Sequence, residues 1–105
     1  MGNPATLRSD FMGGTIRVAG GAGTVTSQSG QWSAAMTKNG TGDYALTVEP
    51  GMDVDEFALI VSIEGSTPLI SSIVHTSDTA KQVLLEDDAG AATDATFKVT
   101  AFRYK

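Results

Sequence analysis

The sequence contains no cysteine and a single histidine, His75, among its 105 residues. The absence of cysteine excludes disulfide bonds and thiol chemistry. A zinc site is not expected either, because cysteine and histidine are its usual ligands. No nucleophile motif accompanies His75, so we interpret it as a structural or rim residue rather than a member of a catalytic triad. These absences predict a protein without a cofactor.

Basic residues are also few, and long apolar runs are missing. Seven Lys and Arg stand against twelve Asp and Glu, which gives a net charge of −5. An acidic domain repels phosphate, so we do not expect a nucleic-acid partner. No segment approaches the roughly 20 apolar residues of a membrane-spanning helix, so we do not expect a membrane partner.

The composition that remains is typical of a small β domain. The hydrophobic fraction is 41%, and a chain of this length buries roughly 65% of its unfolded surface, so one domain with a real core is expected. Twelve glycines, together with abundant Thr, Ser and Ala, favour short strands and many turns over helices.

The clearest strand signal lies between Thr37 and Pro50. Asn39-Gly40 and Gly42 supply the positions tolerant of positive φ that a tight hairpin turn requires. The residues that follow alternate, with the large apolar side chains of Tyr44, Leu46 and Val48 on one face. Pro50-Gly51 ends the strand, because proline cannot donate a hydrogen bond to a neighbouring strand.

The same reading along the chain predicts about eight short strands and no helix of convincing length. Besides the strand in 43–49, they cover residues 15–19, 24–26, 31–38, 57–64, 69–76, 81–86 and 95–104. Trp32 lies on the apolar face of its strand and is predicted to be a core residue. The expected fold class is therefore all-β, an antiparallel β-sandwich, jelly-roll-like, with hairpin and Greek-key connections.

The first thirteen residues differ from the rest, so we divide the chain into an N-terminal arm (1–13) and a β-sandwich domain (14–105). Leu7, Phe11 and Met12 are apolar but follow no strand or helix period. The segment is either a frayed terminus or an extended arm whose apolar side chains dock on a partner.

Two segments depart from the alternation of a half-buried strand. The strand from Phe57 is apolar on both faces, which indicates a central strand of the sandwich or an outer face covered by another subunit. Phe102 and Tyr104 break the alternation of the last strand, which predicts a bulge or a second buried face. If the chain assembles with further copies of itself, Phe57, Leu59, Val61, Phe102 and Tyr104 are the candidates for the subunit interface.

Carboxylates cluster in two loops, at Asp53, Asp55 and Glu56 and at Glu86, Asp87 and Asp88. Paired acids could hydrolyse glycosides, where they stand roughly 5–10 Å apart, and acidic loops could bind calcium. Neither cluster has the spacing of a calcium-binding EF-hand loop, and such loops are usually solvated turns. We therefore predict no catalytic residue, no metal ligand and no enzymatic activity.

Two motifs resemble a known family. Residues 40–48, GTGDYALTV, read as G-x-G-x-Y-x-hydrophobic-x-hydrophobic, resemble the central signature of small β-sandwich domains in tailed-phage virion proteins. Residues 88–101, DAGAATDATFKVTA, resemble the final hairpin of the same family, with an acidic-glycine turn, an Asp and then a Phe before the last strand. The resemblance covers about Gly14 to Tyr104, and RVAGG at 17–21 is compatible with its first strands.

The resemblance implies a structural module that assembles as a homotrimer, with no catalytic residues. Domains of this kind occur as capsid decoration (cement) proteins and at the ends of tail fibres. A chain that starts with its own Met and has no fibre shaft favours the capsid surface of the virion, with the arm holding the major capsid protein. The alternative is a receptor-binding tip of a tail fibre, which could use Trp32 or Tyr44 on its surface.

Overall fold

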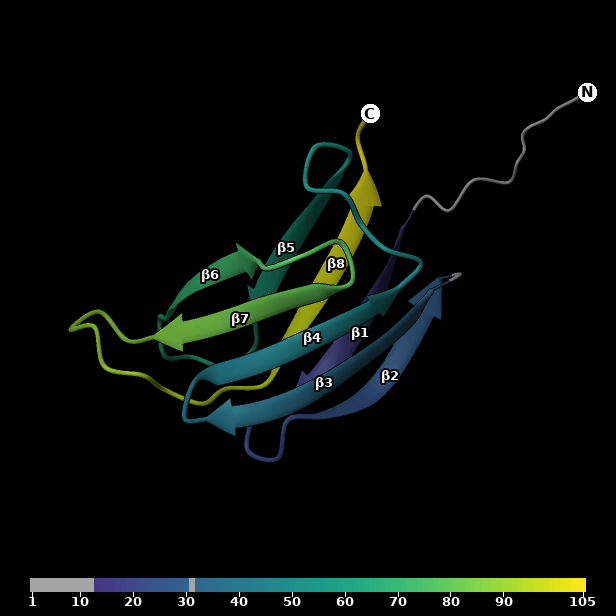
Figure 1. Cartoon of the computed structure of the whole chain (residues 1–105). Helices are drawn as coiled ribbons and strands as arrows, with labels where there is room; N and C mark the ends of the chain where they lie inside the picture. The colour runs from purple at the N-terminus through teal and green to yellow at the C-terminus, as the bar shows by residue number, and fades with distance from the viewer. Residues whose placement is uncertain (1–12, 31) are drawn as a thin grey trace, which may run out of the picture.

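The chain folds into eight antiparallel β-strands (Figure 1). The computed structural model describes residues 13–30 and 32–105, and within these ranges it contains no helix. The strands are β1 (Gly13–Ala19), β2 (Thr24–Gly30), β3 (Ser33–Gly40), β4 (Asp43–Glu49), β5 (Phe57–Ile63), β6 (Ile70–His75), β7 (Ala80–Glu86) and β8 (Phe97–Arg103). Each predicted strand range overlaps one of them, so the prediction of an all-β fold is confirmed.

The strands form two four-stranded sheets, in the orders β2-β1-β8-β5 and β3-β4-β7-β6. The sheets pack face to face, and the predicted antiparallel β-sandwich is confirmed (Figure 1). The finer jelly-roll description stays a prediction. The predicted arm, with Leu7, Phe11 and Met12, lies outside the described residues apart from Gly13, which begins β1.

The core lies between the sheets and follows the predicted alternation. Each inner strand contributes every second side chain, as in β4, where Tyr44, Leu46 and Val48 are all buried. Trp32 is 6% exposed, and its Nε1 donates a hydrogen bond of 2.8 Å to the carbonyl oxygen of Ser29, so its predicted place in the core is confirmed. The buried apolar set is Ile16, Val18, Trp32, Ala34, Tyr44, Leu46, Val48, Met52, Phe57, Val83, Leu85, Phe97, Val99 and Ala101.

The β3–β4 hairpin turns two residues later than predicted. Gly40 is still a strand residue, paired with Asp43 across the hairpin, and a register shift lies between Lys38 and Gly40. The turn itself consists of Thr41 and Gly42, and Gly42 has a φ of +64°. The prediction that Asn39-Gly40 forms the turn is therefore wrong, whereas the positive φ predicted at Gly42 is confirmed.

β5 is an edge strand rather than a central one, so that half of the prediction is wrong. It pairs with β8 on one side and forms the end of its sheet. The register between β5 and β8 has no shift, and neither has that between β1 and β8, so the bulge predicted from Phe102 and Tyr104 is also wrong. Phe102 instead points away from the core, because it alternates with the buried Ala101.

Candidate functional site

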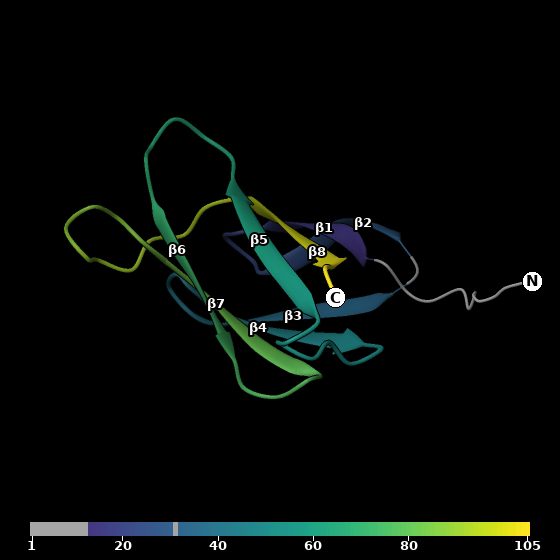
Figure 2. The same ribbon diagram turned by 90° about the horizontal axis from the view of Figure 1, so that it is seen from above.

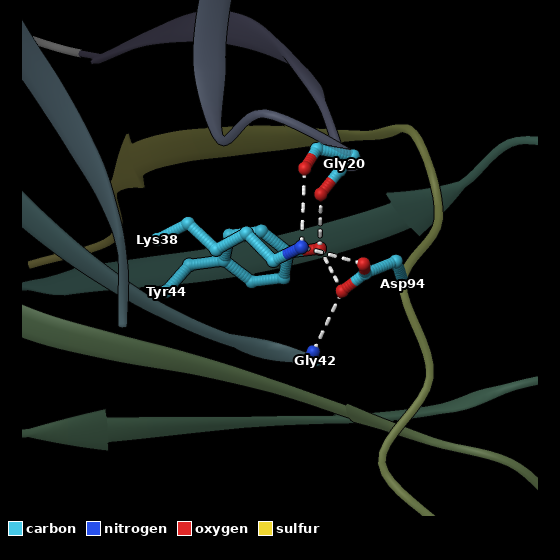
Figure 3. A network of polar contacts seen from close by, with 6 residues as sticks. Gly20, Lys38, Gly42, Tyr44 and Asp94 are labelled. Atoms are coloured by element: carbon cyan, nitrogen blue, oxygen red, sulfur yellow. Dashed lines mark hydrogen bonds and ion pairs between the residues drawn. The ribbon is translucent and has the colours of Figure 1, made fainter. Parts of the chain in front are cut away.

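The carboxylate of Asp94, in the loop before β8, accepts hydrogen bonds from three residues (Figure 3). Its Oδ2 accepts a hydrogen bond of 2.6 Å from Lys38 Nζ, which also makes this contact an ion pair. Its Oδ1 accepts one of 2.8 Å from the backbone N–H of Gly42. One side chain thus ties the β7–β8 loop to the β3–β4 hairpin.

Tyr44 extends this network into the core. Its side chain is fully buried, and its hydroxyl lies 2.8 Å from the carbonyl oxygen of Gly20 and 3.1 Å from Asp94 Oδ1. Its ring meets that of Phe97 edge to face, with 5.0 Å between the ring centroids. This geometry is the favourable one for two aromatic quadrupoles. The Asp94 network therefore fastens the β1–β2 loop, the β3–β4 turn and the β7–β8 loop at one end of the sandwich.

The pKa values of Tyr44 and Asp94 fit a structural role for the Asp94 network. Burial, reinforced by the Asp94 carboxylate, raises the pKa of Tyr44 to about 12, so the phenol stays protonated at neutral pH. Lys38 and the N–H of Gly42 hold the pKa of Asp94 below its usual range, so the carboxylate stays charged. Neither group has a pKa near 7, which general acid–base catalysis favours.

Replacing Tyr44 by phenylalanine removes the hydroxyl while keeping the ring. We expect Tyr44→Phe to lower the free energy of unfolding by about 1–2 kcal/mol at pH 7, because the acceptors at Gly20 and Asp94 lose a buried donor. The unfolded tyrosine titrates near pH 10 and the folded one near 12, so ionisation of the unfolded chain should cost the wild type up to about 3 kcal/mol over that window. The variant should lack this loss.

Urea unfolding at pH 7 to 11.5, followed by circular dichroism, measures both effects of Tyr44→Phe. Tyr104→Phe is the matched control, because that side chain is 57% exposed and its hydroxyl bonds only at the surface, to Val54 O. Its stability should change by less than roughly 0.5 kcal/mol. Equal stability and an equal alkaline decline in Tyr44→Phe and the wild type would contradict the buried hydroxyl's role.

A second buried polar group, Lys81, lies on the inner face of β7. Its side chain is 3% exposed, and Nζ donates hydrogen bonds to the carbonyl oxygens of Met52 (2.7 Å) and Ser77 (2.6 Å). It thus connects the β4–β5 and β6–β7 loops. Burial lowers the pKa of Lys81, and the nearby Asp78 and Asp53 carboxylates offset only part of this effect. His75 lies opposite Lys81 in β6, and partial burial together with the Lys81 charge lowers its pKa.

Sequence reasoning missed both joints. Asp94 stands out in the sequence only as a further carboxylate and as the Asp of the second motif, and no local pattern pairs it with Lys38 or Gly42. Lys81 carried a clearer signal, since residue 81 shares the face of Val83 and Leu85 in a period of two. A lysine on that face is either buried or at the end of the strand.

The acidic loops use their carboxylates to form their own turns. Asp53 Oδ1 accepts the N–H of Asp55 at 2.9 Å, and Asp87 Oδ1 accepts the N–H groups of Ala89 and Ala91, also at 2.9 Å. The Asp53 loop leads into β5, whose first residue pairs with the last residue of β8, whereas the Asp87 loop follows β7 and leads toward the first residue of β8. The two acidic loops therefore do not meet at one end of that strand. In residues 13–30 and 32–105, no three His, Asp or Glu lie close enough together to hold a metal ion.

The predicted interface residues occupy different environments. Phe102 and Tyr104 are 40% and 57% exposed and offer surface to a partner. Leu59 and Val61 are partly buried and pack against the core from β5. Phe57 is 7% exposed, with the Arg103 guanidinium 5.7 Å from its ring centroid, so it offers little surface. The interface itself stays a prediction.

Trp32 and Tyr44 are both buried, so neither is available as a surface contact to a receptor.

Comparisons with protein-family models, with curated proteins and with solved structures found no match to this chain. Over the described ranges, no helix has the length and apolar character needed to cross a membrane.

Proposed function

We propose that the protein is a structural component of a tailed-phage virion, a capsid decoration protein that binds the outer capsid as a trimer. The observation that supports this proposal most is the contact between the two motifs that carry the family resemblance. Gly42 and Tyr44 belong to the first motif, Asp94 and Phe97 belong to the second, and all four meet in one joint. The residues that carry the resemblance therefore form one structural unit of the sandwich.

The proposed mechanism is physical and involves no catalysis. Three copies pack around a threefold axis and present three N-terminal arms toward the shell, with Leu7, Phe11 and Met12 as the contacts to the major capsid protein. Weak contacts add when they are held together, because the second and third arms bind at high effective concentration. A trimer clamped across neighbouring capsomers then opposes the internal pressure of packaged DNA, while the net charge of −5 limits adhesion to nucleic acid.

Deletion of residues 1–12 tests the arm. We expect the truncated chain to keep its fold, because β1 begins at Gly13, and to lose at least tenfold in affinity for undecorated capsids. Co-sedimentation with capsids built from the major capsid protein encoded by the same phage measures this. The matched control is Leu7→Ser/Phe11→Ser in the full-length chain, which keeps the arm's length but removes its apolar groups. Undiminished binding by both variants would contradict the arm mechanism.

A receptor-binding tip of a tail fibre is the alternative, and one observation favours it. Tyr104 is 57% exposed beside Val54, which is 49% exposed in the acidic β4–β5 loop. An exposed aromatic ring beside polar groups is suited to stacking on a sugar. Binding of the purified protein to susceptible host cells, lost in Tyr104→Ala and combined with no binding to capsids, would favour this alternative.

A further inference from the structure

The two long sides of the sandwich are built differently. On one side lie the edge strands β2 and β3, and on the other lie β5 and β6, joined by the loop at 64–69 (Figure 2). The pairing of β2 with β1 has a register shift between Arg17 and Val18, and β3 carries Lys38. Bulges and lysines are the devices that keep an edge strand from pairing with another chain.

The β5–β6 side has none of these devices. Neither strand contains a charged residue or a proline, and neither shows a register shift against its neighbour. Ile60 of β5 is 52% exposed, and Ile70 and Val74 of β6 are 57% and 42% exposed. Apolar edges without a bulge or a charge are templates for strand addition.

A groove of about 460 Å³ opens between the two edges. Val61 and Ile63 line it from β5, Leu69 and Ser71 line it from the β6 end, and residues 65–68 close it. Val61 and Ile63 are only partly buried although they face the core. The sandwich therefore remains open along this side in the single chain.

Charge indicates what covers this side. Two copies of a chain with a net charge of −5 repel each other, so they approach with least cost where charge is absent. β5 and β6 provide an uncharged stretch on both edges. Two acids flank β5 directly along the chain, Glu56 and Glu64, and both are paired. Arg17 Nε and Nη2 lie 2.8 and 3.0 Å from the carboxylate oxygens of Glu64, and Arg103 Nη2 lies 3.5 Å from Glu56 Oε1.

We propose that the β5–β6 side is the surface through which copies of this chain associate, with β5 of one copy against β6 of the next. The inference rests on the proposed trimer and specifies its interface. In a threefold ring each β5 edge meets a β6 edge, so the contacts close and no edge on that side remains open. The core of the interface then consists of Ile60, Ile70 and Val74, with Phe102 and Tyr104 outside it.

Lysine substitutions at matched exposed positions test the proposal on the purified full-length chain. Ile60→Lys and Val74→Lys introduce a charge on the β5–β6 side, and Ser27→Lys and Ala35→Lys introduce the same charge on exposed positions of β2 and β3. By sedimentation equilibrium, the wild type and the two controls should have a mass of about 32 kDa, three times 10.8 kDa. Ile60→Lys and Val74→Lys should fall threefold to the monomer mass while keeping the wild-type circular dichroism spectrum.

Crosslinking provides a readout that does not depend on weakening the assembly. The chain has no cysteine, so single cysteines can be placed at the exposed Ser62 of β5 and Ser72 of β6. Differently tagged Ser62→Cys and Ser72→Cys chains, mixed and treated with a short bismaleimide, should give a mixed dimer. The pair Ser27→Cys with Ser72→Cys should give none.

Three outcomes would overturn the proposal: a monomeric wild type at all concentrations, an unchanged mass in Ile60→Lys and Val74→Lys, or a loss of assembly on deletion of residues 1–12. Loss of assembly on that deletion would indicate that the N-terminal segment of a second copy, and not its β5 or β6 edge, covers the β5–β6 side. None of these measurements uses capsids. A trimer that fails to bind capsids therefore refutes the decoration function alone. A monomer that binds capsids refutes the trimer and its interface and leaves capsid binding standing.

Discussion

Lys81→Ala should lower the free energy of unfolding by about 2–4 kcal/mol, a large part of the stability of a domain of this size. The lysine stem fills space beside core residues of β7, and its ammonium satisfies the buried carbonyl of Met52 and that of Ser77. Alanine leaves a cavity and two carbonyls without their donor. The release of a desolvated charge offsets part of this loss and does not reverse it.

Two further variants separate the contributions of Lys81. Lys81→Met keeps most of the volume and removes only the ammonium, so it should cost less than Lys81→Ala. Lys98→Ala is the control for the loss of a positive charge, because Lys98 is exposed on β8, and it should change stability by less than roughly 0.5 kcal/mol. Urea denaturation followed by circular dichroism measures all three. If Lys81→Ala were as stable as Lys98→Ala, Lys81 would not stabilise the fold by connecting the β4–β5 and β6–β7 loops.

Lys81 also predicts a pH dependence opposite in sign to that of Tyr44. Because burial lowers its pKa in the folded chain, the cost of the buried charge is complete below the folded pKa. That cost is relieved as the pH rises from the folded pKa toward the ordinary value of 10.5. Lys81 therefore increases stability as the pH rises toward 10.5, whereas the raised pKa of Tyr44 decreases stability between pH 10 and about 12. Lys81→Ala should abolish the increase and Tyr44→Phe the decrease.

The strands were predictable from sequence because their signal is local. In β4 the alternation of Tyr44, Leu46 and Val48 with polar neighbours determines which face is buried, whichever strands lie beside it. The order of the strands in each sheet could not be predicted in this way. The apolar run of β5 indicates that much of its surface is covered but does not say by what, so the sequence alone did not distinguish this edge strand from a central strand.

The contacts of Asp94 and Lys81 could not be predicted from the sequence, because they join parts of the chain that no local pattern connects. The partners of Asp94, Lys38 and Gly42, lie 56 and 52 residues away along the chain. The partners of Lys81 are backbone carbonyls, whose positions depend on how the loops at 50–56 and 76–79 fold. Every residue has a carbonyl, so no residue type marks these acceptors. Side-chain parity could place Lys81 on the inner face, but the oxygens that accept its hydrogen bonds become identifiable only in the folded chain.

The β3–β4 turn provides the sharpest test of the Asp94 joint, because two nearby glycines should respond differently. Gly42→Ala should cost roughly 3 kcal/mol, since an alanine at a φ of +64° is strained and its Cβ would overlap the backbone of Leu85 and Thr93. Moving the turn would also displace the N–H that binds Asp94. Gly40→Ala should change stability by less than roughly 0.5 kcal/mol, because the added Cβ meets nothing within 4 Å.

The comparison of these two variants distinguishes strain at one position from a general need for glycine in the hairpin. If Asn39-Gly40 were the turn, as the sequence pattern predicted, Gly40→Ala would be the damaging change. Thermal unfolding by calorimetry, with both variants at the same pH, decides between the two. Because Gly42 joins the hairpin to the β7–β8 loop, its substitution should also weaken the Lys38–Asp94 ion pair. The cost of Asp94→Ala should then be smaller in the Gly42→Ala background than in the wild type, and additive costs would show that the turn and the joint are independent.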